Sequence, residues 1–253
     1  MITIKNINEA NKDIIESAYL LKFCRYLSRY FIVFLANKSL NPLVVNYLNL
    51  LIAIFALTIF ALDIEHNLLI ATVLLFIWQF IDTIDGGIAR VRKIVNNYGG
   101  YIDYITGMII IAFLPVCISI ACINNSTSKD LFFGFISLEL TDLNILAIGC
   151  FSSISSIFSR FINHTIKIRF GIDNSTKVKK DFNNIFSNIL VNIENIGGLQ
   201  LVFLLLAIIM NSTVYFLVVY AIINISIFII VFLHSLSKYY NQSSYHPLIN
   251  KKV

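Results

Sequence analysis

Long apolar runs separated by short polar connections dominate this chain. The pattern predicts six membrane-spanning helices, at residues 43–62, 67–93, 98–123, 143–170, 196–210 and 214–238. The second run is long, and its last dozen residues carry acidic and basic side chains. We therefore expect that end to reach the polar interface of the bilayer.

Before the first run, the pattern changes from continuously apolar to mixed. Residues 11–37 combine apolar positions with Lys22, Arg25 and Arg29, which follow one another at spacings of three and four. Such spacing places the charges on one face of a helix. An amphipathic helix lying on the inner face of the membrane is predicted here.

Asn41 and Pro42 mark a break after this helix, because proline disfavours helix in the residue before it. Three regions follow from the pattern. They are an interfacial region at 1–42, a six-helix membrane domain at 43–238, and a cytosolic tail at 239–253.

Composition supports an all-α integral membrane protein. The chain has 253 residues, of which 58% are hydrophobic and only 13% are charged. Its net charge of +5 comes from Lys and Arg between the apolar runs, without a basic stripe, so no nucleic-acid partner is expected.

The positive charges also predict an orientation. The N-terminal region, residues 90–93, the connection after the fourth run and the C-terminal tail are basic, whereas the three alternate connections hold one Lys. Positive residues favour the cytosolic side. Both termini and the charged end of the second run should therefore face the cytosol, in the cytoplasmic (inner) membrane.

Three acids in and after the second run carry the candidate chemistry. Asp82 and Asp85 are three residues apart, so they share a helix face with Gly86 and Ala89. Asp103 lies near the start of the next run, four residues after Gly99. Two antiparallel helices would bring the three carboxylates together.

Like charges this close repel one another unless a cation joins them. Mg²⁺ and Mn²⁺ bind carboxylate oxygens and bridge phosphate groups, so Asp82, Asp85 and Asp103 are predicted metal ligands. Gly86 and Ala89 leave room for a phosphate-bearing ligand to approach the helix, and Gly87 is expected to add to that room. The alternative interpretation is that these acids form ion pairs with Arg90, Arg92 and Lys93 in another kind of membrane protein, such as a transporter.

The segment from Asp82 to Asp103 resembles the signature of the CDP-alcohol phosphotransferase family. That signature reads D-x-x-D-G-x-x-A-R, about eight residues, then G-x-x-x-D-x-x-x-D. The matching residues are Asp82, Asp85, Gly86, Ala89, Arg90, Gly99 and Asp103.

The resemblance implies an interfacial helix, six membrane helices, and transfer of a phosphoalcohol group to an acceptor hydroxyl with release of CMP, as in phospholipid synthesis. Asp85 and Asp103 would be catalytic. Asp82, Gly86, Ala89, Arg90 and Gly99 would bind the CDP-alcohol. CDP-diacylglycerol is one such donor, and membrane lipids and a homodimer are further partners that the family suggests, with Gly149, Ser152 and Ser153 permitting close helix contact.

Acceptor binding is assigned to three basic residues near the cytosolic end of the fourth run. Arg160, Lys167 and Arg169 could dock an anionic acceptor there. Anchoring at the membrane interface is an equally good interpretation of each.

The chain departs from the family at the last motif position, where Gly107 replaces the aspartate that serves as general base and metal ligand. Three explanations stay open. Another group supplies the base, the acceptor needs little activation, or the chain binds CDP-alcohols without transferring them. Asp103, Glu194 and His164 are the replacement bases that the sequence offers.

Overall fold

A computed structural model describes residues 2–11, 18–38, 40–94, 97–125, 130–133, 136–170 and 196–243. In chain order, its elements are α1 (Ile4–Ala10), α2 (Tyr19–Asn37), α3 (Pro42–Ala61), α4 (Asn67–Val91), α5 (Asn97–Asn124), β1 (Asp130–Phe133), β2 (Ile136–Glu139), α6 (Asp142–Phe170), η1 (Ile196–Gln200), α9 (Leu201–Ile209) and α10 (Thr213–Ser243).

Five helices of the described chain are long and apolar enough to span a bilayer, as expected of an integral membrane protein. They are α3, α4, α5, α6 and α10. The expected span at 196–210 corresponds to η1 and α9, where the apolar helix Gly198–Ile209 is shorter than the other five. Gly198 has non-helical backbone angles that interrupt the helix. The sixth span is therefore not established by length.

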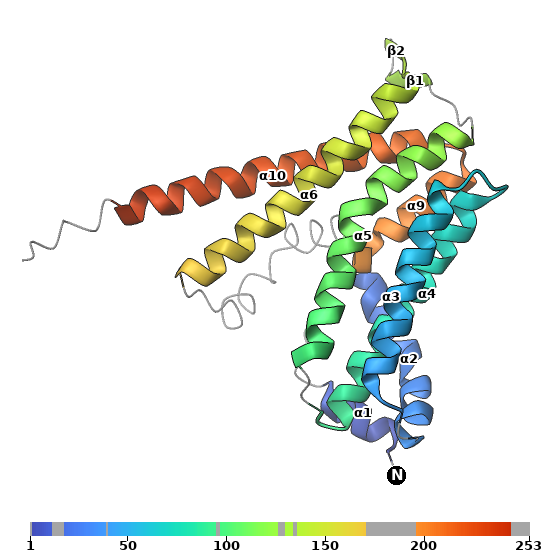
Figure 1. Ribbon diagram of the computed structural model, residues 1–253, viewed down its shortest axis with the longest axis vertical. Coiled ribbons are helices and arrows are strands. Elements are labelled where there is room, and N and C mark those ends of the chain that lie inside the picture. Colours follow the sequence, from blue (N-terminus) through green and yellow to red (C-terminus); the bar gives the residue numbers. More distant parts are fainter. Residues whose placement is uncertain are drawn as a thin grey trace, which may run out of the picture.

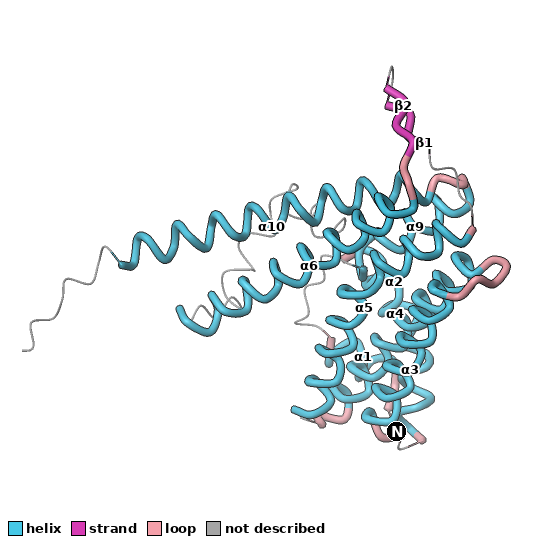
Figure 2. Tube along the Cα trace, turned by 45° about the horizontal axis from the view of Figure 1, so that its top comes forward, coloured by secondary structure: helices cyan, strands magenta, loops and turns pink. Residues whose placement is uncertain are grey.

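The helices form two groups (Figure 1). α3, α4 and α5 pack side by side with α2 along α4, and α9 also contacts α4. α6 and α10 lie along each other and extend away from this group. The view in Figure 2 shows the same division. The charged end of α4 and the start of α5 lie at the same end of the bundle as α1.

The break predicted before the first span is confirmed. Asn41 caps α3, and its side chain accepts a hydrogen bond from the Leu43 backbone nitrogen at 3.0 Å. Pro42 occupies the first turn of the helix, where its missing N–H costs nothing. The chain therefore enters α3 with a fixed geometry next to the end of α4.

α2 contacts the bundle through one stripe of side chains. Its buried residues recur every four positions: Leu20, Cys24, Ser28, Ile32 and Ala36. The opposite face exposes large apolar residues, which are Tyr19, Phe23, Tyr26, Leu27, Tyr30, Phe31 and Phe34. Ile32 is fully buried and packs onto Gly87 of α4, where an added Cβ would lie 2.9 Å from Ile32 Cγ1.

A short hairpin interrupts the otherwise helical chain between α5 and α6. β1 and β2 pair antiparallel, with Asp130 opposite Glu139 and Phe133 opposite Ile136. The hairpin lies at the end of the molecule away from the N-terminus (Figure 1). Apart from this hairpin, the described elements are helical, as the all-α expectation requires.

Small residues on α6 are used for packing inside the chain. Gly149 is buried against α5, where an added Cβ would lie 2.7 Å from the Pro115 carbonyl oxygen. Ser152 accepts a hydrogen bond from Asn224 of α10 at 2.8 Å, and Ser153 is also buried. These three residues therefore do not form the outward surface that was expected for a dimer.

Candidate functional site

The three predicted metal ligands come together. One carboxylate oxygen from each of Asp82, Asp85 and Asp103 lies within 4.8 Å of the other two. Asp85 is buried, Asp82 is partly buried and Asp103 is exposed. The cluster thus has a protein-facing side and a side open to solvent.

Helix spacing and one contact between helices explain why the acids converge. Asp82 and Asp85 are one turn apart on α4, and Asp103 lies in the second turn of α5. The first turn of α5 is tied to α3, because Asn46 Nδ2 donates to the Gly99 carbonyl oxygen at 3.1 Å. Asn46 therefore helps set the height at which Asp103 faces α4.

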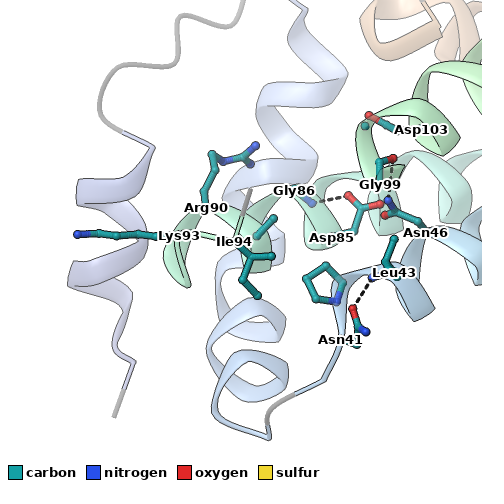
Figure 3. A pocket seen from close by; sticks show the side chains of 13 residues that line it. Asn41, Leu43, Asn46, Asp85, Gly86, Arg90, Lys93, Ile94, Gly99 and Asp103 are labelled. Carbon is teal, nitrogen blue, oxygen red and sulfur yellow. Dashed lines mark hydrogen bonds between the residues drawn. The ribbon is translucent and has the colours of Figure 1, made fainter. Parts of the chain in front are cut away.

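A pocket of about 340 Å³ opens beside the acids. Its lining consists of Asn41, Pro42, Leu43, Asn46, Asp85, Gly86, Ala89, Arg90, Lys93, Ile94, Gly99, Gly100 and Asp103. Figure 3 shows Asp85, Asn46, Gly99 and Asp103 on one side of it and Arg90 on the other, while the Lys93 side chain points away. All the predicted CDP-alcohol residues except Asp82 line this pocket.

Two buried oxygens in this lining have no hydrogen-bond partner among the described residues. They are Asp85 Oδ2 and Asn46 Oδ1. The other Asp85 oxygen accepts from the Gly86 backbone nitrogen. A buried acceptor without a donor is costly, so two of them in one pocket call for a cation or a hydrogen-bond donor. Carboxylate and amide oxygens are ligands that hard divalent cations prefer, so the donor set fits such an ion.

Asp82 sits beside a second asparagine. The Asn49 amide lies 3.5 Å from Asp82 Oδ1. In the orientation that satisfies both of its polar atoms, Asn49 instead donates to the Trp78 carbonyl oxygen at 2.9 Å and accepts from Trp78 Nε1 at 3.3 Å. Asn49 is nearly inaccessible to solvent, at 2% exposure. Asn49 therefore places a polar side chain, rather than an apolar one, next to Asp82.

Gly86 and Ala89 were expected to leave an open slot for the ligand, and this small-residue slot has a different form in the structure. Gly86 and Ala89 do line the pocket, but the Arg90 guanidinium covers the bare face of Gly86. An added Cβ at Gly86 would lie 2.9 Å from Arg90 Nη1 and 3.4 Å from Nη2. A ligand approaching Gly86 therefore meets a planar cation.

Gly87 does not enlarge the slot, so that expectation is wrong. Its open side is filled by Ile32 of α2, and its role is to let α2 approach α4 closely. Gly107 is different, because an added Cβ there would meet no atom within 4 Å. It lies one turn after Asp103, on the same face of α5.

The basic residues assigned to the acceptor are all on α6. Arg160 is partly buried and does not line the pocket beside the acids. The side chains of Lys167 and Arg169 lie outside the described residues, as does Glu194. His164 is exposed, and its ring lies 6.2 Å from that of Tyr104, the residue after Asp103.

Sequence reasoning missed the roles of two residues that organise this site. Asn46 is one, and Arg92 is another, since it donates to the Leu40 carbonyl oxygen at 2.7 Å and also to that of Ala36. These bonds tie the turn after α4 to the connection between α2 and α3. A polar side chain at the pocket end of α3 was the signal that could have pointed to Asn46. Its hydrogen-bond partner, Gly99, is 53 residues away, so the sequence alone did not identify the contact.

Comparison with known proteins shows a match to a protein family. Residues 40–176 match a family model described as CDP-alcohol phosphatidyltransferase, which covers more than half of the chain and the whole pocket. No curated protein matches the chain.

Proposed function

The chain belongs to the CDP-alcohol phosphatidyltransferase family, and we propose that it transfers a phosphoalcohol group from a CDP-alcohol to an acceptor hydroxyl with release of CMP. Family membership supports phosphoalcohol transfer in lipid synthesis. The convergence of Asp82, Asp85 and Asp103 beside a pocket large enough for a ligand is the observation that carries the proposal. CDP-diacylglycerol or another CDP-alcohol is the donor.

Asp82, Asp85 and Asp103 would hold Mg²⁺ or Mn²⁺, with the unpartnered Asn46 oxygen facing the same pocket. When bound, such an ion polarises the β-phosphate of the donor and neutralises charge on the departing CMP. Every other contribution comes from the chain itself.

The chain's residues bind and orient the donor. Gly86, Ala89 and Gly99 give the nucleotide access to the helix backbones, and Arg90 offers its guanidinium to the diphosphate. Asp85 is buried and stays a ligand, whereas Asp103 is exposed to an arriving acceptor. We therefore propose that Asp103 accepts the proton of the acceptor hydroxyl. The oxygen of that hydroxyl attacks the β-phosphorus, and the bond between this phosphorus and CMP breaks.

The acceptor enters from the polar side of the site. Arg160, Lys167 and Arg169 on α6 are the cations proposed to attract an anionic acceptor such as a sugar phosphate. Their mutation should raise the KM for an anionic acceptor and leave that for an uncharged one unchanged.

The finer features of the membrane arrangement also belong to this proposal. α2 would lie at the cytosolic interface, with Arg29 over the Tyr26 ring at 5.0 Å as one of its interfacial contacts. The segment of η1 and α9 would complete a six-helix domain at 43–238, with both termini cytosolic. A homodimer would have to use a surface other than the buried Gly149 face.

Purified protein incubated with Mg²⁺ or Mn²⁺, a panel of CDP-alcohols and a panel of acceptors tests the function through the CMP released. We expect metal-dependent release, which Asp85→Asn abolishes. Unchanged release by Asp85→Asn would overturn the metal assignment.

Gly107 favours one second candidate, a family member that binds CDP-alcohols but does not transfer them. At Gly107 the chain lacks a side chain where the family has its base. CDP-alcohol binding without any CMP release would support this candidate. Cation flux without nucleotide binding would support a transporter instead.

A further inference from the structure

The N-terminal helix α1 is fixed to the same end of the bundle as the acids. Its Ile7 is fully buried in an apolar cluster with residues of α2, α3 and α4. Just before the helix, the Ile2 backbone exchanges two hydrogen bonds with the Asn37 amide, at 2.8 and 2.9 Å. α1 is thus held by an apolar contact in its middle and a polar contact at its start.

The residue that caps the end of α1 reaches the pocket wall. Asn11 Oδ1 accepts a hydrogen bond from Arg90 Nε at 2.9 Å, across 79 positions of sequence. This bond uses the inner nitrogen of the guanidinium. The outer nitrogens of Arg90 then lie over Gly86, at the edge of the slot between Gly86 and the acids.

This geometry fixes a planar cation in the pocket that Asp85 and Asp103 also line. An arginine held through Nε presents its two outer nitrogens as a fork, which matches two oxygens of a phosphate. A long side chain that is already held in place loses less conformational entropy when a ligand binds. The contact between α1 and Arg90 therefore prepares the pocket for an anion.

We propose that Asn11 is a positioning residue, which orients Arg90 so that the N-terminal helix sets the affinity of the pocket for a nucleoside diphosphate. The identity of that anion rests on the proposed function, whereas the coupling between Asn11 and Arg90 rests on their hydrogen bond. Asn11 itself touches no reacting atom.

Binding of CDP to the full-length protein in the presence of Mg²⁺, measured by titration calorimetry, tests the proposal without turnover. We expect Asn11→Ala to weaken CDP binding about tenfold, the size of effect typical of a lost hydrogen bond to a charged group. Asn11→Asp keeps an acceptor for Arg90 and should restore binding. Asn8→Ala is the matched control, since Asn8 is exposed on the same helix.

A double mutant separates positioning from a general loss of structure. In an Arg90→Ala background, Asn11→Ala should cause no further loss of CDP affinity, because the group that it orients is gone. A full tenfold loss in that background, or an equal loss in Asn8→Ala, would overturn the proposal. Thermal unfolding of each variant shows whether a loss of affinity comes from a loss of fold.

The same titration separates this inference from the proposed function. Wild-type protein that binds CDP and never releases CMP contradicts phosphoalcohol transfer, while the Asn11 comparison is still decided. Wild-type protein that binds no CDP overturns the assignment of the anion as well.

Discussion

Under the proposed function, replacing Gly107 by aspartate should raise the rate of phosphoalcohol transfer. The position lies one turn after Asp103 on α5, and an added Cβ would meet no atom within 4 Å. A Cβ therefore fits there without moving a neighbour. It would stand on the same face as Asp103 and next to the cluster of acids.

The expected gain follows from the chemistry that the position lacks. A positioned general base typically contributes about 10²- to 10⁴-fold to a rate. Gly107→Asp would take the hydroxyl proton, leaving Asp103 as a metal ligand alone. Stability should change little, since replacing a helical glycine by aspartate gains only about 0.3 kcal/mol from helix propensity, and a fourth carboxylate adds repulsion until a cation binds.

The measurement is CMP release per enzyme at saturating metal and donor, with Mn²⁺ affinity measured separately by electron paramagnetic resonance. Gly107→Asn is the matched control, because it has nearly the same size and shape but no base. We expect Gly107→Asp to exceed both the wild type and Gly107→Asn by at least about a hundredfold and to bind Mn²⁺ more tightly. Equal rates for the aspartate and asparagine variants would refute the reasoning.

Three further predictions concern packing and the metal. Gly149→Ala should lower the free energy of unfolding by about 1–3 kcal/mol, because its Cβ meets the Pro115 carbonyl oxygen; Gly100→Ala, which meets nothing within 4 Å, is the control in a thermal unfolding assay. Gly87→Ala should cost a similar amount, and Ile32→Val should recover part of it by removing the methyl group that the new Cβ would touch; no recovery in the double mutant would contradict this packing. Asn46→Leu should weaken Mn²⁺ binding roughly 10- to 100-fold, whereas Asn46→Asp, which keeps an oxygen, should retain it. Equal Mn²⁺ affinities of the wild type and Asn46→Leu would show that Asn46 does not contribute to the metal site.

The membrane helices and the acidic cluster could be predicted because each depends on local pattern. Apolar length alone located α3, α4, α5, α6 and α10 to within a few residues, except that α10 continues past the expected end at 238. The spacing of Asp82 and Asp85 fixed their common face, and the short connection to α5 brought Asp103 beside them. Family resemblance then gave these positions a chemical meaning.

What could not be predicted depends on contacts between distant segments. Arg90 is oriented by Asn11, and no local pattern links residues 79 positions apart. Gly87 resembles a ligand-binding glycine in sequence, yet its use is decided by Ile32 on another helix. The residues of η1 and α9 were predicted as one continuous apolar helix, because hydropathy does not detect the kink at Gly198.

The position of Asp82 along α4 sets the depth at which chemistry can occur. The carboxylate lies 15 residues after the start of the helix at Asn67, or about 22 Å along an axis that rises about 1.5 Å per residue. With Asn67 at one edge of hydrocarbon about 30 Å thick, the carboxylate lies about 8 Å inside the opposite edge. A donor with acyl chains could therefore react without leaving the bilayer, and a water-soluble acceptor would need to descend about 8 Å below the edge of the hydrocarbon to meet it.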